Sequence, residues 1–310
     1  MKSTWQGADF TSVDSLTLET LSELFDKADV MKQVVEEKGG NNVLAGRVMA
    51  ALFYEPSSRT FGSFVSAMQR LGGGVIPFQG MTASSVAKGE SLADTAKVFS
   101  SFADVLVMRN PEVGSVDTLA KNAWVPVISA GDGIGEHPTQ ALLDAYTIRA
   151  EFGSFDKLHL VIVGELAHYR PVNSLAKLVA LFPGVKMSFV AFPEFALQPE
   201  VRKFLQSKNV NFSEHVELDD VVADADVLYV TRPKKEFIPV ELYRLALGKY
   251  VITTRTLEKM KKKSIVMHAL PRLDEIAVEV DDDPRAIYLT KQMKNGMYVR
   301  MALLDLIING

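Results

Sequence analysis

The stretch "FYEPSSRTFGSF", residues 53–64, joins a strand-like segment to a helix-like one. The apolar run "VMAALF" ends before Tyr54, and three hydroxyl residues and an arginine follow before a pattern of helical period begins. A helix N-terminus has unpaired N–H groups and partial positive charge, and hydroxyls and a guanidinium add further donors. The stretch predicts either an anion-binding turn at Ser57-Ser58-Arg59-Thr60 or a serine-capped helix with a solvated arginine. It is not a P-loop, because G-x-x-x-x-G-K-[ST] is absent.

The same alternation of strand and helix continues along the chain. Apolar, β-branched runs of strand length lie at residues 48–54, 74–78, 104–108, 125–129, 158–164, 185–192, 226–231 and 264–269. Helix-period segments between them include residues 62–71, 91–102, 138–152, 172–182 and 197–207. The strands do not alternate apolar and polar residues, which is typical of strands buried on both faces. The pattern predicts an α/β fold of mostly parallel sheets flanked by helices.

The long helix at 138–152 separates four predicted strands from four others. We therefore expect two domains of similar size, residues 1–140 and residues 150–292. The last helix, "GMYVRMALLDLIIN" at 296–309, is strongly apolar and needs a surface to cover. We expect this C-terminal segment, 293–310, to pack back on the first domain and complete it.

Composition excludes several classes of protein. The 310 residues contain no cysteine, which excludes disulfides, thiolate metal sites and a cysteine nucleophile. The net charge is -4, and no basic footprint for nucleic acid is visible. No run approaches the roughly 18–20 apolar residues of a membrane helix, and the N-terminus has no apolar signal segment. We expect a cytoplasmic enzyme acting on small molecules, without metal or cofactor.

Two strand ends carry an arginine. "ADVLVMR" (103–109) and "ADVLYVTR" (225–232) each run from Ala-Asp to an arginine, Arg109 and Arg232. In open parallel sheets, ligands bind outside the carboxyl ends of strands. Each domain therefore directs one arginine to that edge, although a surface arginine can also end a strand without any function.

Three polar segments add candidates. In "GDGIGEHPTQALLD" (131–144), Pro138 fits the first helical position, so His137 lies at the helix mouth and Gln140 one turn on, unless His137 merely caps the helix. Lys88 lies in a polar loop before a helix, where it can close over an anion or simply be exposed. "VIVGELAHYRPVNSL" (161–175) places Arg170 at a helix start, and its lone Gly164 is no dinucleotide fingerprint.

These residues favour catalysis by positioning. The predicted cations and hydroxyls suit a phosphorylated substrate and an acidic partner. No pair of catalytic carboxylates, metal cluster or nucleophile triad stands out in the sequence. The inventory therefore suits alignment of two substrates and oxyanion stabilisation rather than a covalent intermediate.

Taken in order, the motifs resemble the catalytic chain of the aspartate branch of the aspartate/ornithine carbamoyltransferase superfamily. They are "YEPSSRT" at 54–60, "KGE" at 88–90, "VMR" at 107–109, "HPTQ" at 137–140, "TR" at 231–232 and "HALPRLDEI" at 268–276. The resemblance covers nearly the whole chain. It implies transfer of a carbamoyl group from carbamoyl phosphate to L-aspartate, a step of pyrimidine biosynthesis. It also implies a homotrimer with active sites at subunit interfaces, in which regulatory or multienzyme partners can occur.

The resemblance also implies roles for individual residues. Ser57, Ser58, Arg59 and Thr60 would hold the phosphate. Thr60, Arg109 and His137 would polarise the carbamoyl carbonyl, and Gln140 would bind its amide. Ser84 and Lys88 would reach in from a neighbouring subunit, and the backbone at Leu270 would help to place the substrates. Arg170 and Arg232 would bind the aspartate carboxylates, together with Lys88 and Lys234.

Departures from the family pattern gather in the acceptor half. The usual Gly-Asp-Leu-Lys-x-Gly-Arg-Thr-Val-His reads Gly-Glu-Leu-Ala-His-Tyr-Arg-Pro-Val-Asn at 164–173. Ala167, Tyr169 and Pro171 thus replace a lysine, a glycine and a threonine, and Lys234 stands where the family has a glutamine. Ser58 replaces a threonine but keeps the hydroxyl, and Ala269 replaces a proline.

Four interpretations remain at this point. Both acceptor arginines survive, which favours aspartate as the acceptor. A paralogue that carbamoylates another acidic amine is the second hypothesis, and a catalytically weak binding or scaffold subunit is the third. A nucleotide-dependent oxidoreductase is the fourth, and it lacks the glycine fingerprint.

Overall fold

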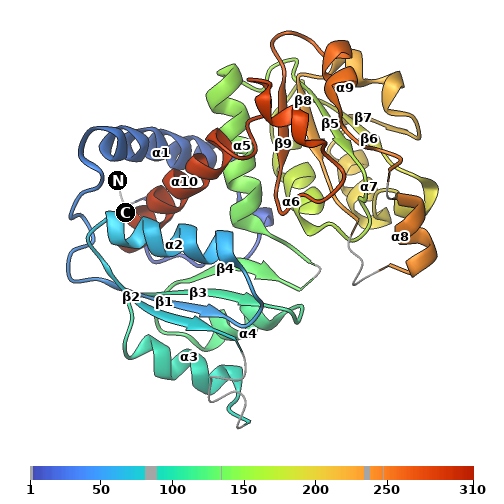
Figure 1. Cartoon of the computed structure of the whole chain (residues 1–310). Helices are drawn as coiled ribbons and strands as arrows, with labels where there is room; N and C mark the ends of the chain where they lie inside the picture. The colour runs from blue at the N-terminus through green and yellow to red at the C-terminus, as the bar shows by residue number, and fades with distance from the viewer. Residues whose placement is uncertain (1–2, 81–88, 134, 234–237, 247) are drawn as a thin grey trace. The chain divides into compact units, whose positions relative to one another are not determined.

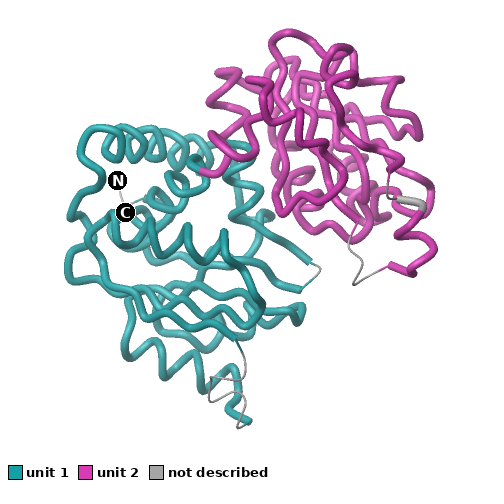
Figure 2. Tube along the Cα trace, viewed as in Figure 1, with its two compact units in different colours: residues 1–146, 294–310 teal, residues 147–293 magenta. Residues whose placement is uncertain are grey.

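A computed structural model describes residues 3–80, 89–133, 135–233, 238–246 and 248–310. The chain forms two compact units (Figure 2). Unit 1 comprises residues 1–146 and 294–310, and unit 2 comprises residues 147–293. The chain therefore leaves unit 1 once and returns to it for its last helix.

Unit 1 is built on a parallel sheet of four described strands in the order β2-β1-β3-β4. The strands are β1 (Val48–Phe53), β2 (Gly74–Gln79), β3 (Val105–Asn110) and β4 (Val127–Asp132). The chain adds β2 on one side of β1 and then crosses to add β3 on the other. The strand order thus reverses between β1 and β3, and ligands bind at the carboxyl ends of such a switch point.

Helices cover both faces of this sheet (Figure 1). They are α1 (Leu18–Lys38), α2 (Ser58–Arg70), α3 (Leu92–Ser100), α4 (Ser115–Asn122), α5 (Pro138–Phe152), which belongs to unit 1 up to residue 146, and α10 (Lys291–Ile308), which belongs to it from residue 294. Alternate residues of β1 face opposite sides, and Ala50 and Leu52 form one core with Ala96 of α3 and Leu119 of α4. On the other face, the ring of Phe53 meets Phe61 of α2 edge to face at 5.2 Å.

The C-terminal helix belongs to unit 1, as the sequence predicts. In α10, Asp305 forms an ion pair of 2.8 Å with Lys27 of α1. The N–H of Gly7, near the other end of the chain, donates to the carbonyl of Ile307 at 2.9 Å. The helix begins at Lys291, five residues before the expected start at 296. Its apolar face is thereby buried against its own unit.

Unit 2 contains a second parallel sheet, of five described strands in the order β7-β6-β5-β8-β9. The strands are β5 (His159–Val163), β6 (Lys186–Val190), β7 (Asn211–His215), β8 (Val227–Val230) and β9 (Ile265–His268). The helices between them are α6 (Arg170–Val179), α7 (Pro199–Ser207), α8 (Val240–Ala246) and α9 (Thr254–Lys259). The order reverses between β5 and β8, which gives unit 2 a switch point of its own.

The structure confirms the α/β class and all eight predicted strands, and it adds or corrects several details. Strand β7 was not predicted, because its sequence "NFSEH" holds a single apolar residue at the sheet edge. Helix α1 was not predicted either, although its buried residues recur with helical spacing. Helix α2 begins at Ser58 rather than at 62, so Ser58, Arg59 and Thr60 lie inside its first turn.

Candidate functional site

The first turn of α2 presents the predicted anion-binding segment at the switch point of unit 1. Ser57 is the N-cap residue, with extended backbone and no hydrogen bond from its side chain to the helix. Its hydroxyl instead accepts from Nη1 of Arg109 at 3.2 Å. Ser58 and Arg59 are exposed, whereas Thr60 is buried. Hydroxyls, a guanidinium and the helix N-terminus thus gather where an anion gains from all of them.

Arg109 is bound by a carboxylate of its own unit. Its Nε and Nη2 donate to Oε2 and Oε1 of Glu55 at 3.1 and 3.0 Å. The sheet enforces this contact, because Phe53 of β1 pairs with Arg109 of β3 and Tyr54 donates its N–H to the Arg109 carbonyl at 2.8 Å. Sequence reasoning quoted Glu55 within its motif but gave it no role. A bidentate carboxylate has the same fork geometry as a phosphate, so Glu55 competes for the group that an anion needs.

His137 and Gln140 occupy the start of α5, after the loop that follows β4. Pro138 is the first residue of this helix, as predicted. Both side chains are buried, at 5% and 6% exposure. Because β4 pairs with β3, this loop leaves the same sheet edge as Arg109. Nε2 of Gln140 donates to Oδ1 of the fully buried Asp144 at 3.0 Å, so the amide has a fixed neighbour.

Arg170 and Arg232 follow the two central strands of unit 2. Arg170 is buried at the first residue of α6, and Arg232 lies two residues beyond the end of β8. Nε of Arg232 is buried and has no hydrogen-bond partner within the described residues. Thr231 joins the two strand ends, since its hydroxyl donates to the carbonyls of Val163 and Glu165 at 3.0 Å each.

Gly164 allows this close approach of β5 and β8. Its φ is +120°, and a Cβ at this position would lie 2.6 Å from both the carbonyl oxygen and the hydroxyl of Thr231. Any side chain would therefore push the two strand ends apart. The lone glycine noted in the sequence serves strand packing.

A buried carboxylate braces the loop before Arg170. Oε1 of Glu165 accepts from the backbone N–H of His168 at 2.7 Å and contacts Nδ1 of the same residue at 3.1 Å. Glu165 is 1% exposed, whereas His168 reaches the surface. Sequence reasoning noted neither residue as functional. A glutamate three residues before a histidine gives no signal of this contact without the loop geometry.

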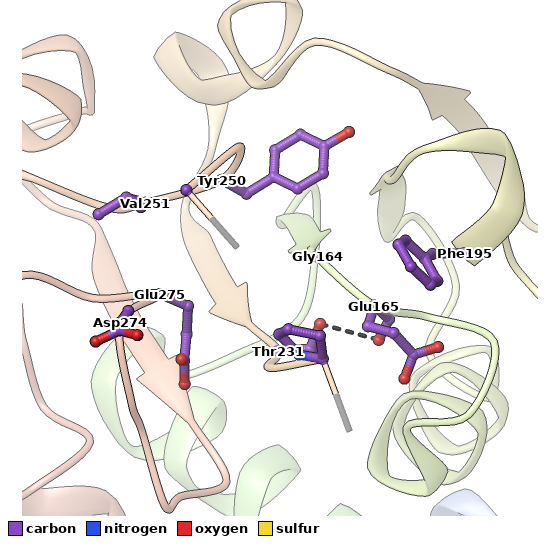
Figure 3. A pocket seen from close by; sticks show the side chains of 10 residues that line it. Gly164, Glu165, Phe195, Thr231, Tyr250, Val251, Asp274 and Glu275 are labelled. Atoms are coloured by element: carbon purple, nitrogen blue, oxygen red, sulfur yellow. Dashed lines mark hydrogen bonds between the residues drawn. The ribbon is translucent and has the colours of Figure 1, made fainter. Parts of the chain in front are cut away.

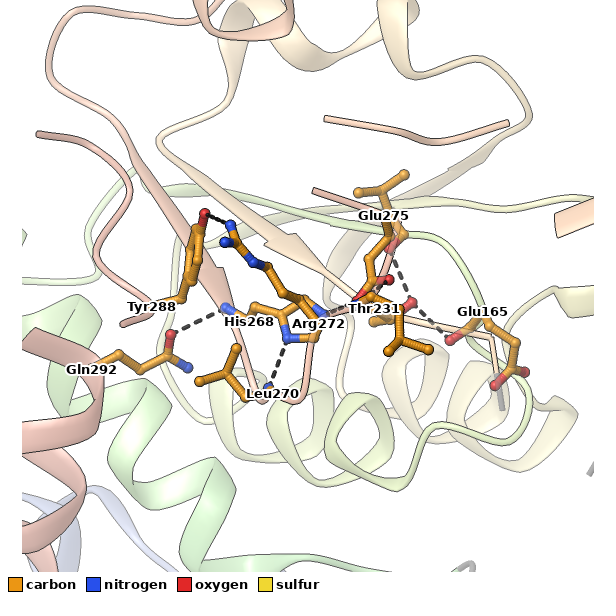
Figure 4. Close-up of polar contacts among 10 residues, drawn as sticks. Glu165, Thr231, His268, Leu270, Arg272, Glu275, Tyr288 and Gln292 are labelled. Atoms are coloured by element: carbon orange, nitrogen blue, oxygen red, sulfur yellow. Dashed lines mark hydrogen bonds and ion pairs between the residues drawn. The ribbon is translucent and has the colours of Figure 1, made fainter. Parts of the chain in front are cut away.

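Leu270 lies in a backbone conformation that few residues other than glycine adopt. Its φ is +57°, which costs about 1–2 kcal/mol for an L-residue. Its N–H donates to Nδ1 of His268 at 2.7 Å, and Oε1 of Gln292 accepts from the N–H of His268 at 3.1 Å (Figure 4). Nε2 of His268 in turn contacts Oε1 of Glu275 at 2.8 Å. This network holds the Leu270 backbone in place, as a substrate-positioning peptide requires.

Glu275 stays ionised in this network. Burial acts to raise the pKa of Glu275, but the hydrogen bonds that it accepts from His268 and from the backbone outweigh burial and hold that pKa below its usual range. A small cavity of about 20 Å³ lies beside it at the carboxyl ends of β5 and β8 (Figure 3). Glu165, Thr231, Tyr250 and Glu275 line it, while Arg170, Arg232 and Leu270 are not among its described lining residues.

The structure thus places the predicted residues at strand ends and helix starts, in two groups, one in each unit. Ser84, Lys88 and Lys234 lie outside the described residues. Among the residues that are described, no three or more acidic, histidine or cysteine side chains gather as a metal site would require. No helix in the described part of the chain has both the length and the apolar character needed to cross a bilayer.

Comparisons with known proteins agree over both units. Residues 8–150 match the family model of the aspartate/ornithine carbamoyltransferase carbamoyl-P binding domain, and residues 156–307 match that of the Asp/Orn binding domain. The chloroplastic aspartate carbamoyltransferase of Arabidopsis thaliana is 46% identical over 94% of this chain and 75% of its own. The multifunctional protein CAD of Squalus acanthias is also 46% identical, over 97% of this chain, which spans only 13% of that relative's length.

A solved structure shows the same likeness in three dimensions. Aspartate transcarbamoylase from Trypanosoma cruzi, crystallised with carbamoyl phosphate, superposes with a TM-score of 0.94 at 39% sequence identity. The match covers 99% of this chain and 97% of that one. The likeness therefore extends through both sheets and their connections.

Proposed function

Because the chain belongs to the aspartate/ornithine carbamoyltransferase family, we propose that it carbamoylates L-aspartate with carbamoyl phosphate. The amine nitrogen attacks the carbamoyl carbon and forms the new C–N bond. A tetrahedral oxyanion results, the bond from carbon to the phosphate oxygen breaks, and phosphate leaves. The amine proton passes to the departing phosphate or to solvent. The products are N-carbamoyl-L-aspartate and phosphate.

The observation that carries this proposal is the arrangement at the switch point of unit 1. The α2 N-terminus and Arg109 share a contact through Ser57, and His137 and Gln140 follow the neighbouring strand. In this proposal, the first turn of α2 binds the phosphate. Arg109, His137 and Thr60 donate to the carbonyl oxygen. A single donor at such an oxyanion contributes about 2.7–4 kcal/mol to catalysis.

Glu55 gives this site a defined first step. Carbamoyl phosphate brings a negative charge toward a guanidinium that Glu55 already binds through two hydrogen bonds. The substrate must displace the carboxylate or share the guanidinium with it. Binding of the first substrate therefore weakens the contact between Glu55 and Arg109.

The acceptor half follows from unit 2. Arg170 and Arg232 supply two guanidinium groups for the two carboxylates of aspartate, and Lys88 and Lys234 add positive charge in this proposal. Bidentate guanidinium–carboxylate pairs fix orientation as well as affinity. The peptide at Leu270, held by His268, helps to place the substrates in this proposal.

One observation favours a second candidate, carbamoylation of a different acidic amine. Pro171 is the second residue of α6, where it removes one of the N–H donors that a carboxylate at this helix start would use. Tyr169, the N-cap residue, is buried at 3% exposure and fills space where a glycine is usual in the family. These replacements change the acceptor pocket and leave the carbamoyl phosphate side intact.

Phosphate release from carbamoyl phosphate tests both candidates. L-aspartate is compared with L-glutamate, L-cysteate, β-alanine and L-ornithine at saturating carbamoyl phosphate. Saturable turnover with L-aspartate supports the first candidate. Turnover with another acidic amine alone supports the second, and binding without turnover for any amine would indicate a scaffold subunit.

We also propose that the protein is a cytoplasmic homotrimer that can associate with regulatory or multienzyme partners. The trimer is supported by the family resemblance, in which Ser84 and Lys88 serve a neighbouring subunit's site. Light scattering should give three times the chain mass of 34.1 kDa. A monomer with full activity would contradict the shared site.

A further inference from the structure

A buried arginine of the C-terminal helix touches both helices that carry the unit 1 site. Arg300 of α10 is 3% exposed. Its Nη1 donates to the Ser63 hydroxyl of α2 at 3.1 Å, and its Nη2 donates to the Thr139 hydroxyl of α5 at 3.5 Å. The guanidinium also lies 5.1 Å from the centre of the Phe64 ring. One side chain thus links the second turn of α2 to the first turn of α5.

Local packing directs Arg300 into this position. Gly296 lies one turn earlier in α10, and its carbonyl accepts from Nη1 of Arg300 at 3.0 Å. A Cβ at Gly296 would come within 2.9 Å of that nitrogen and 3.0 Å of Leu143 of α5. The glycine therefore provides the space in which the guanidinium folds back along its own helix and reaches α5.

A buried guanidinium is costly, and the protein balances it with Asp144. Burial lowers the pKa of Arg300 to about 10, while the charge of Asp144 acts in the opposite direction. Asp144 is itself fully buried in α5. Apolar residues usually stabilise a core at least as well as buried ions. The presence of this charged pair beside the site therefore indicates a need for defined geometry.

Asp144 also contacts Gln140, the residue that binds the carbamoyl amide in the proposed function. Its Oδ1 accepts from Nε2 of Gln140 at 3.0 Å. An ionised carboxylate only accepts hydrogen bonds, so Gln140 must turn its NH₂ group toward Asp144. The amide oxygen then faces away from Asp144 and is left to accept. A carbamoyl group offers an NH₂ donor to it, whereas an acetyl group offers only a methyl.

We propose that Arg300 and Asp144 are positioning residues that hold the Gln140 amide with its oxygen toward the substrate, and that this polarity selects carbamoyl over acyl phosphates. The inference rests on the proposed function, since it assigns Gln140 to the carbamoyl amide. The positive charge of Arg300 favours the negatively charged form of Asp144. Asp144 in turn fixes which end of the Gln140 amide the substrate meets.

Two stable ligands test this polarity without turnover. Phosphonoacetamide carries the NH₂ group, and 2-oxopropylphosphonate carries a methyl in its place. We expect calorimetry to show that the wild-type protein binds the amide about tenfold more tightly, the value of one good hydrogen bond. Asp144→Asn places a donor beside the Gln140 oxygen and allows the amide to turn. We expect this preference to fall to about twofold or less.

Arg300 variants separate charge from packing. Arg300→Met fills most of the volume without charge, and we expect the amide preference to fall as in Asp144→Asn. Arg300→Lys restores the positive charge beside Asp144 and should recover most of the preference. Equal loss in both variants would show that packing alone matters and would overturn the proposed role of the charge.

Asp305→Asn is the matched control on the same helix. It breaks the ion pair between α10 and α1, so it should lower Tm without changing the ligand preference. An unchanged preference in Asp144→Asn, or an equal loss in Asp305→Asn, would overturn the inference. The proposed function fails separately, if wild-type protein keeps the tenfold preference but releases no phosphate with any amine.

Discussion

The central arginines of the two units differ in their hydrogen bonding. Arg109 in unit 1 is bound by Glu55 and Ser57 through three hydrogen bonds. Arg232 in unit 2 has a buried Nε that lacks a hydrogen-bond partner within the described residues. The Arg109 guanidinium of unit 1 is therefore held in place before any ligand binds. Unit 2 leaves a donor for a ligand to satisfy, which suits an acceptor that binds second.

The strongest test of this contrast is removal of Arg109. Arg109→Ala deletes a donor that we propose for the developing oxyanion, and we expect kcat to fall by about 10²–10³-fold. Steady-state phosphate release measures it. Arg109→Lys keeps the charge but loses the fork, so it should recover only part of the rate. If the kcat of Arg109→Ala stays within threefold of the wild-type value, the carbamoyl carbonyl of the substrate does not bind at Arg109.

Removal of Arg232 should affect the acceptor alone. Arg232→Ala leaves a carboxylate of the acceptor unpaired, and we expect its KM to rise by about 30-fold or more. The KM for carbamoyl phosphate should stay within a factor of two. Arg202→Ala, which breaks an exposed pair with Glu214, is the control in the same unit. A parallel rise in both KM values would mean that the units do not divide the substrates as proposed.

A smaller effect is expected at the brace of the acceptor loop. Nε2 of Gln198 donates to the carbonyl of Ala167, and its Oε1 accepts from Nδ2 of Asn173 at 3.2 Å. Gln198→Leu removes both bonds, and we expect the acceptor KM to rise about fivefold as Arg170 loses its fixed approach. Titration of the acceptor at saturating carbamoyl phosphate measures this. Gln198→Glu keeps only the bond from Asn173 and should rescue little.

Acid should weaken unit 2 more than unit 1. Burial acts to raise the pKa values of Glu275 and Asp281, yet bonds from His268 and Arg272 lower both overall. The hydrogen bond from Arg285 lowers the pKa of Asp283, and burial lowers the pKa of His159. In each case the folded unit binds fewer protons than the unfolded chain. Stability is thus lost as pH falls below about 6.5 for the histidine and about 4 for the carboxylates.

In unit 1, Asp9 has the opposite effect on the pH dependence of stability. Burial raises its pKa, and a hydrogen bond from Val127 lowers that pKa only in part. The folded unit therefore binds more protons at Asp9 than the unfolded chain does. The two tryptophans, Trp5 and Trp124, both belong to unit 1, so their fluorescence reports that unit alone. Between pH 7 and pH 4, the melting temperature by circular dichroism should fall by a few degrees more than that by fluorescence. Coincident shifts would contradict the difference in acid sensitivity.

Much of the architecture is readable from local sequence. Continuous apolar runs predict parallel strands, and all eight of those predicted exist, including the edge strand β2. The edge strand β7 fails this rule, because its side chains are partly exposed and mostly polar. The start of α2 was placed four residues late, since its first turn holds hydroxyls and Arg59 rather than apolar residues.

The site is readable only in part. Short motifs place Arg109, His137 and Gln140 at strand and helix ends, because topology puts those ends at one edge. The contacts that set their state depend on pairs far apart in sequence, such as Arg109 with Glu55. Arg300 did carry a signal, as a single arginine inside a strongly apolar helix must find a buried partner. The identity of that partner needs the fold.

The return of the chain to unit 1 has a consequence for its biosynthesis. Arg300 meets Ser63 across a separation of 237 residues. Unit 2 is contiguous, so it can complete its core while α10 is still unmade. Parts of α2 and α5 in unit 1 meanwhile stay uncovered. Contacts between residues far apart in the sequence form late, and apolar surface remains exposed until they form. Of the two units, the one that leaves the ribosome first is thus the last to be finished, and it exposes apolar surface for longer.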